Sequence, residues 1–354
     1  MVAASHYPRE KELMKTTVKK AILRFADLVP TFLYRILVPR KMISFFYHLV
    51  SDKVIPHVQY LYPHRPVELF EQDLIYIKDN FHVLSYEELS HALTSRTHLP
   101  PRAAFLSFDD GFSECFSMAR PLLLKYKLHC TFFLATNLID NRDMDSLHKV
   151  SLCIAKLSSL SPVECARMLS AFWQAFGVNL DGAASFARWI KMVDDDDHLP
   201  KTCDILGVDV DDYLRTRSPY LTREQIHTMA AEGFTIGAHS QRHKKLGRLS
   251  QEEIEQEIVN SCHEIHDLTG KEPVPFAFPY SAMGIEMDFL RSLLKRTPLV
   301  GFLFNTRGLS LDEPFIVNRI WVESPKFNPT GQTSLPLILR HAYQAHLGLP
   351  PIGQ

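Results

Sequence analysis

The chain contains 354 residues, of which 46% are hydrophobic and 22% are charged, and its formal net charge is −1 at pH 7. This composition is typical of a soluble globular protein, and the near-zero charge argues against nucleic-acid binding through a positive field. The six cysteines are scattered without a CxxC pair, which disfavours a disulfide framework or a zinc knuckle and is typical of buried thiols in a reducing compartment.

The N-terminal segment, residues 1–41, includes a basic amphipathic stretch at residues 15–41 that predicts a helix. Helices of this kind pack against a domain or lie on an anionic membrane surface. Packing is the favoured interpretation, and peripheral membrane contact is the alternative. The first 15 residues are too polar for a secretory signal, and no apolar run reaches about 18 residues. We therefore expect a cytoplasmic protein. A cytoplasmic protein that associates with the membrane surface is the alternative.

Short runs with β-strand character then alternate with helical patterns. The seven candidate strands cover residues 42–49, 103–108, 130–135, 234–239, 275–280, 300–305 and 315–322. The four clearest helical patterns cover residues 67–80, 113–126, 222–233 and 250–268. A capping box at Ser250 and Glu253 marks the start of the last helix. This alternation predicts an α/β fold with parallel strands, and seven strands suit a barrel.

Residues 140–220 interrupt the alternation with helical patterns and are too long for a simple connection. We interpret this segment as a helical insertion in a barrel that spans residues 42–325. Its four consecutive aspartates at 194–197 lack the ligand spacing of a calcium loop and predict a solvated turn. Residues 326–354 are expected to form a C-terminal tail or helix.

The motif SFDDG places Asp109 and Asp110 directly after the apolar strand at 103–108. At the carboxyl end of a barrel strand such side chains reach the mouth, where active sites lie. One carboxylate can bind a metal there while the other stays available as a general base. Taken alone, the motif is explained equally well by a turn followed by a helix N-cap.

A second motif, HSQRH, places His239 and His243 four residues apart, immediately after the strand at 234–239. If the segment turns helically, both imidazoles can bind one cation. One aspartate with two histidines would leave positions on a divalent ion open for water and substrate. A third motif ends a strand at Pro279 and Tyr280, which can present a backbone N–H and an aromatic ring to the mouth.

In this order, SFDDG, HSQRH and FPY resemble the polysaccharide deacetylases of carbohydrate esterase family 4, which share the NodB-homology fold. The resemblance covers roughly residues 42–325 apart from the insertion. It implies a distorted (β/α)7 barrel, here with a helical insertion and an N-terminal amphipathic helix. It also implies metal-dependent removal of an N-acetyl group from an amino sugar, and therefore an N-acetylated carbohydrate as the substrate.

The resemblance also assigns roles to individual residues. Asp109 matches the catalytic base, and Asp110, His239 and His243 match the metal ligands. Tyr280 matches the residue whose backbone N–H helps to hold the oxyanion, and it is expected to bind substrate together with Pro279 and Tyr47. Zinc is the expected ion, with cobalt, nickel or manganese as alternatives.

Two departures from the family pattern concern the base and the acid. Ala277 occupies the position of the arginine that commonly steadies the base, and Arg319 is the candidate replacement. The late histidine motif is matched only loosely by His341. His48 ends the first strand and resembles the acid histidine of a branch with rearranged motifs, so we favour His48 as the general acid over His341.

Three functions remain open at this point. The first is a deacetylase that acts on a polysaccharide or a glycan precursor. The second is an amidohydrolase of the same fold that acts on a lipid-linked or nucleotide-linked amino sugar, a formamide or a cyclic ureide, because a fold does not fix its substrate. The third is an inactive carbohydrate-binding protein, which is disfavoured because every metal position and the base are present.

Overall fold

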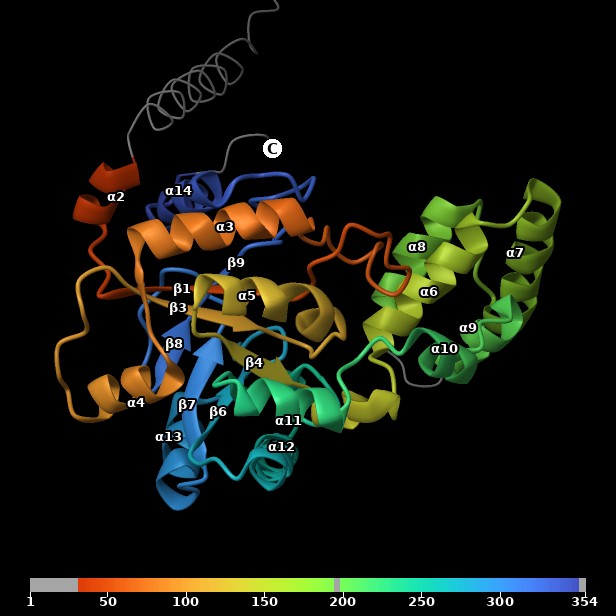
Figure 1. The fold of residues 1–354 in the computed structure, drawn as a ribbon. Helices are drawn as coiled ribbons and strands as arrows, with labels where there is room; N and C mark the ends of the chain where they lie inside the picture. The colour runs from red at the N-terminus through yellow and green to blue at the C-terminus, as the bar shows by residue number, and fades with distance from the viewer. Residues whose placement is uncertain (1–30, 194–197, 350–354) are drawn as a thin grey trace, which may run out of the picture.

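The computed structural model describes residues 31–193 and 198–349. Parallel strands form a nearly closed barrel with helices around it (Figure 1), which confirms the predicted fold class. The strands are β1 (Met42–Tyr47), β2 (His82–Val83), β3 (Ala103–Phe108), β4 (Thr131–Leu134), β5 (Thr235–Ala238), β6 (Val274–Ala277), β7 (Val300–Asn305), β8 (Ile316–Asn318) and β9 (Ile320–Trp321).

The last two strands bring the barrel close to closure. The sheet order is β8-β7-β6-β5-β4-β3-β1-β9, with β2 paired to β3. Strands β8 and β9 are separated only by Arg319, yet β8 pairs with β7 and β9 pairs with β1 at the far end of that order. Arg319 therefore lies where the last strands of the barrel meet β1, and below we call this junction the seam of the barrel.

Helices surround the strands, and those at residues 67–80, 120–126, 223–231 and 251–269 match the predicted helical patterns. The surrounding helices are α3 (Val67–Asn80), α4 (Tyr86–Thr94), α5 (Arg120–Tyr126), α11 (Arg223–Ala231), α12 (Gln251–Thr269) and α13 (Met287–Arg296). The capping box at Ser250 and Glu253 is present at the start of α12. Because helices cover the outside of the barrel, every residue of β3 is buried, which explains its continuous apolar character.

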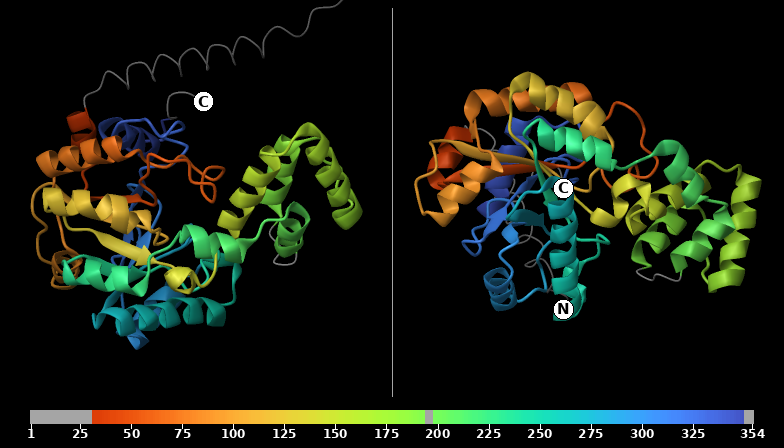
Figure 2. Two further views of the ribbon diagram at one scale, coloured as in Figure 1. Left: turned by 45° about the vertical axis from the view of Figure 1, so that its right-hand side comes forward. Right: turned by 60° about the horizontal axis from the view of Figure 1, so that its bottom comes forward.

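The described residues between 146 and 217 form five helices with a hydrophobic core of their own. They are α6 (Ser146–Ser158), α7 (Pro162–Phe176), α8 (Ala183–Met192), α9 (His198–Leu206) and α10 (Val210–Arg217). Figures 1 and 2 show them grouped on one side of the barrel. Below, we call residues 146–217 the helical insertion. The aspartates at 194–197 lie outside the described residues.

The two ends of the described chain pack together. Helix α2 (Thr31–Leu37) contacts α14 (Leu335–His346), where the rings of Tyr34 and Tyr343 stack. Most of the predicted amphipathic stretch, residues 15–30, lies outside the described residues. Among residues 31–193 and 198–349, no helix combines the length and the hydropathy needed to cross a membrane.

Gly237 in β5 gives the first prediction. A Cβ atom at this position would lie 2.6 Å from Cδ1 of Phe133 and 2.8 Å from the carbonyl oxygen of Pro275. We expect Gly237→Ala to reduce the free energy of unfolding by about 1–3 kcal/mol, because the strands on either side must move apart. Urea denaturation followed by circular dichroism measures this change, and an unaltered midpoint would contradict it.

Candidate metal centre and active site

The two aspartates of the first motif lie at the end of β3 and are almost fully buried. Asp110 and Gly111 both adopt positive φ angles, 71° and 78°, so the chain turns sharply after the strand. Asp tolerates this conformation better than most residues, and glycine adopts it without strain. A Cβ atom at Gly111 would lie 2.9 Å from Cδ2 of Leu134. The turn makes Asp109 and Asp110 diverge toward different partners.

The two histidines converge as predicted, but through a tight turn and not through a helical segment. The chain leaves β5 at Ala238, and both Ser240 and His243 have positive φ, 61° and 53°. The Oγ atom of Ser240 accepts a hydrogen bond from the backbone N–H of His243 at 3.0 Å. This turn, and not helical periodicity, brings His243 beside His239, with ring centroids 5.0 Å apart.

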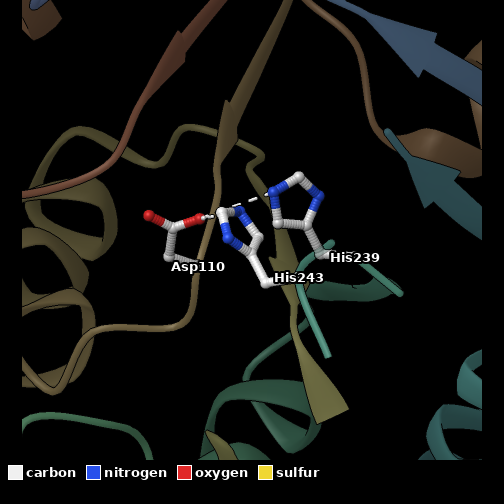
Figure 3. Close-up of side chains that lie close together, drawn as sticks. All are labelled: Asp110, His239 and His243. Carbon is white, nitrogen blue, oxygen red and sulfur yellow. Dashed lines mark ion pairs between the residues drawn. The ribbon is translucent and has the colours of Figure 1, made fainter. Parts of the chain in front are cut away.

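The three residues predicted to bind metal lie together in the structure (Figure 3). Oδ1 of Asp110 is 3.4 Å from Nε2 of His239 and 3.2 Å from Nε2 of His243. The three ligand atoms all lie within 4.8 Å of one another. No other group of this kind is found among the described residues.

Hydrogen bonds on the far side of each imidazole determine which nitrogen faces the centre. Nδ1 of His239 contacts the carbonyl oxygen of Ala277 at 2.8 Å, and Nδ1 of His243 contacts Oδ2 of Asp145 at 2.9 Å. Both partners can only accept, so each Nδ1 carries the proton and each neutral ring presents the lone pair of Nε2.

Three lone-pair donors therefore point at one buried position. Oδ1 of Asp110 accepts no hydrogen bond within the described part of the chain. Bringing three acceptors together without a positive charge is unfavourable, and a divalent cation resolves the conflict. The residues thus fit a cation held by one carboxylate and two imidazoles, which leaves other coordination positions open.

Without a cation, a proton provides the missing positive charge. Burial alone lowers the pKa of His243, but the carboxylates of Asp110 and Asp145 outweigh it and raise that pKa well above its ordinary value. For Asp110 the directions are reversed. Burial raises the pKa of this carboxyl group, but the charge on His243 and the contacts with both imidazoles lower it overall. A proton and a metal ion therefore compete for the same position.

Asp109 is held apart from this group by a buried arginine. Nη1 and Nη2 of Arg319 donate to Oδ1 and Oδ2 of Asp109 at 2.6 and 2.8 Å, and Nη1 also donates to Oγ of Ser107 at 3.1 Å. The Arg319 side chain is fully buried, with its guanidinium 4.4 Å from the ring centroid of Phe46. This paired geometry fixes the orientation of the carboxylate. Arg319, the candidate replacement for the arginine that Ala277 lacks, thus contacts Asp109 directly.

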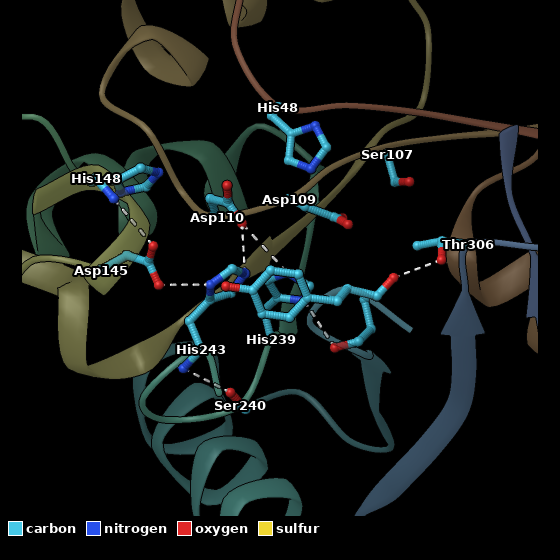
Figure 4. A network of polar contacts seen from close by, with 12 residues as sticks. His48, Ser107, Asp109, Asp110, Asp145, His148, His239, Ser240, His243 and Thr306 are labelled. Carbon is cyan, nitrogen blue, oxygen red and sulfur yellow. Dashed lines mark hydrogen bonds and ion pairs between the residues drawn. The ribbon is translucent and has the colours of Figure 1, made fainter. Parts of the chain in front are cut away.

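His48 lies on the other side of the two aspartates from His239 and His243 in the view of Figure 4. Its Nδ1 is 3.7 Å from Oε2 of Glu323, whose Oε1 accepts hydrogen bonds from the backbone N–H groups of His48 and Leu49. Burial lowers the pKa of His48, but the charges of Glu323, Asp110 and Asp109 outweigh it, so the pKa is raised above 6.5. Negative charge therefore favours protonated His48.

Tyr280 lies at the edge of the metal site. Its ring centroid is 5.1 Å from that of His243, and its carbonyl oxygen accepts a hydrogen bond from Oγ1 of Thr306 at 2.6 Å. The backbone φ of Tyr280 is 60°, and within the described residues its N–H has no hydrogen-bond acceptor. The preceding residue, Pro279, is buried and shapes this turn.

Two predicted residues have side chains that make their contacts elsewhere in the described structure. Tyr47 is fully buried in the main core, and its hydroxyl group donates to Oδ2 of Asp73 at 3.0 Å. The expectation that Tyr47 binds substrate is therefore corrected, because its polar atom is committed inside the protein. His341 lies in α14 and contacts the ring of Phe327, outside the group around Asp110.

Asp145 and Glu323 complete the site and were not identified from the sequence. Asp145 is the N-cap of α6, which an aspartate before a helical pattern could have signalled. Glu323 follows Arg319 by four residues, and a strand that continued past β9 would place both on one face. Neither pattern indicates a partner as distant in the sequence as His243 or His48.

A cavity of about 1380 Å³ opens beside the metal site. One wall is formed by the helical insertion and includes Leu147, Leu199 and Cys203, and the other includes His243 and Tyr280. A ligand in this cavity would touch both the insertion and the metal-binding turn.

The comparisons with known proteins agree with the resemblance seen in the sequence. The family model of polysaccharide deacetylases matches residues 181–297, a range that includes His239, His243 and Tyr280. This match confirms the resemblance to polysaccharide deacetylases. No curated protein sequence is significantly similar to the chain.

Three solved structures share the fold, each at 16% sequence identity. The deacetylase PplD from Streptococcus pyogenes, in complex with acetate, has a TM-score of 0.50, with 83% of this chain and 97% of that chain covered. IcaB from Ammonifex degensii has a TM-score of 0.51, with coverages of 82% and 97%. A de-N-acetylase from Aggregatibacter actinomycetemcomitans has a TM-score of 0.51, with coverages of 84% and 98%.

The competition between a proton and a cation gives the second prediction. Because the pKa of His243 is raised, the cation-free protein holds a proton that a divalent ion must displace. The apparent affinity for Zn²⁺ should therefore fall by about tenfold for each pH unit below that pKa. Calorimetric titration in buffers of different ionisation enthalpy should show proton release on binding. Tight binding that is independent of pH and releases no proton would contradict this interpretation.

Proposed function

Because the chain resembles polysaccharide deacetylases in a family-model match and in its fold, we propose that it is a metal-dependent deacetylase. Its substrate is an amino sugar of a glycan or glycan precursor, from which it removes the N-acetyl group. The observation that carries the proposal is the second carboxylate, Asp109, which lies beside the cation site but is bound by Arg319. A site that only bound a metal would not need this separately oriented base.

A bound divalent cation supplies Lewis acidity, which polarises the acetyl carbonyl and makes a nearby water more acidic. Asp109 accepts the proton from the attacking water, and Arg319 keeps both carboxylate oxygens in place for that transfer. The backbone N–H of Tyr280 donates to the oxygen on which negative charge develops. One such donor typically contributes about 3 kcal/mol to transition-state stabilisation.

His48 completes the reaction as the general acid. The departing amine needs a proton, because an unprotonated amide nitrogen is a poor leaving group. Glu323 holds the backbone at His48 and places negative charge beside Nδ1, which favours the protonated ring. The products are acetate and the free amino sugar. Zinc is the expected ion in this proposal. The carboxylate of Asp110 and the Nε2 atoms of His239 and His243 would hold it.

Substitution of the base tests the proposed reaction directly. We expect Asp109→Asn to reduce kcat by at least about 10²-fold, because general base catalysis is lost while every metal ligand remains. Its bound metal, measured by atomic emission, should stay near the wild-type content. His239→Ala is the comparison variant and should lose both metal and activity. Full deacetylation of an N-acetylated chito-oligosaccharide by Asp109→Asn would remove Asp109 from the mechanism.

The pH profile tests the role of His48. The acid must be protonated, and its pKa is raised by nearby negative charge, so activity should fall on the alkaline side at a pH above about 6.5. Glu323→Gln keeps a carbonyl oxygen for the backbone N–H groups but removes the charge. We expect the alkaline limb of kcat/KM to move to lower pH.

The matched control for that measurement is Glu114→Gln. Glu114 is also buried, but its carboxylate pairs with Arg217 at 2.8 Å and does not contact His48. The control should leave the alkaline limb in place. If Glu323→Gln left that limb unmoved, His48 would not be the acid that sets it.

A further inference from the structure

Asp145 joins the metal site to the helical insertion through the two oxygens of one buried carboxylate. Oδ2 accepts a hydrogen bond from Nδ1 of His243 at 2.9 Å. Oδ1 accepts from the backbone N–H groups of Leu147 at 2.8 Å and His148 at 3.4 Å, which are in the first turn of α6. Figure 4 shows the Asp145 carboxylate between His148 and His243. One side chain therefore orients a metal ligand and caps a helix.

The residues that follow the insertion, Tyr220 and Leu221, contact the same region. The backbone N–H of Asp145 donates to the hydroxyl oxygen of Tyr220 at 3.2 Å, and that hydroxyl lies 2.6 Å from Nδ1 of His148. The next residue, Leu221, donates its N–H to the carbonyl oxygen of Gly111 at 2.9 Å, directly after Asp110. The residues that flank the insertion on both sides thus contact the two turns that carry the predicted metal ligands.

We propose that Asp145 is a positioning residue that couples cation binding to the order of the first turn of α6. The hydrogen bond from His243 to Asp145 keeps the proton on Nδ1 and aims Nε2 at Asp110. A fixed carboxylate is needed for this, and the capped amides of α6 fix it. Because coupling between two sites is reciprocal, a cation that orders His243 also orders the first turn of α6.

This coupling reaches the cavity beside the metal site. Leu147 and His243 both line that cavity, from its insertion wall and its barrel wall. Binding of the cation therefore organises both walls of the space that would receive a ligand. The inference depends on cation binding and not on which bond the protein hydrolyses.

Asp145→Ser separates the two roles of the side chain. Serine is an effective N-cap, so the first turn of α6 keeps an acceptor, but its shorter side chain no longer reaches His243. We expect the affinity for Zn²⁺, measured by competition with a chromophoric chelator, to fall by about 10- to 100-fold. The absorption spectrum of the Co²⁺-loaded protein should change as well, because the orientation of one imidazole is no longer fixed.

Asp209→Ser is the matched control. Asp209 is the N-cap of α10 in the same insertion and accepts a hydrogen bond from the N–H of Asp212 at 2.8 Å. It makes the same kind of cap without touching a metal ligand. Zn²⁺ affinity and the Co²⁺ spectrum should match those of the wild type. Equal loss of affinity in both serine variants would overturn the proposal, and so would wild-type affinity in Asp145→Ser.

A second measurement on the wild-type chain does not depend on any variant folding. Hydrogen exchange followed by mass spectrometry compares peptides at the start of α6 with peptides at the start of α10, with and without Zn²⁺. The proposal predicts a larger gain in protection at α6, and loss of this difference in Asp145→Ser. Equal gains at both helices, or no gain at α6, would contradict the coupling.

Discussion

The structure depends on a conflict between three electron-pair donors that only a positive charge can resolve. A carboxylate oxygen of Asp110 and the Nε2 atoms of His239 and His243 face one another inside the protein. The hydrogen bonds to Ala277 and Asp145 prevent either imidazole from turning its Nδ1–H toward the centre. The proposed function places a divalent cation at this point, and the proposed chemistry depends on it.

The seam of the barrel carries the residues that contact the proposed acid and base. Arg319 lies between β8 and β9 and binds Asp109, and Glu323, four residues later, lies beside His48. Trp321 is between them, with its ring centroid 5.2 Å from that of His48. The chain turns at Val322 and Glu323, directly after β9. The segment that brings the barrel close to closure therefore also orients the two groups that would transfer protons.

Local patterns in the sequence predicted much of the fold and the metal ligands, but not their supporting contacts. The strands and the cap of α12 follow from periodicity and turn residues, which act over a few positions. The spacing of the histidines in HSQRH indicated that they could converge, but not how, because positive φ angles at Ser240 and His243 determine that turn. Asp145 and Glu323 were missed because their partners lie about 100 and 275 positions away, and no short motif encodes such pairings.

X-ray absorption at the zinc edge of the Zn²⁺-loaded full chain tests the central claim most directly. The account predicts one ion per chain, with two imidazole nitrogens and otherwise oxygen in its first coordination shell. It also predicts that the imidazole signal falls to one in His243→Ala. A shell that contains sulfur, or that keeps both imidazoles after this substitution, would contradict the account, as would failure of the chain to bind zinc.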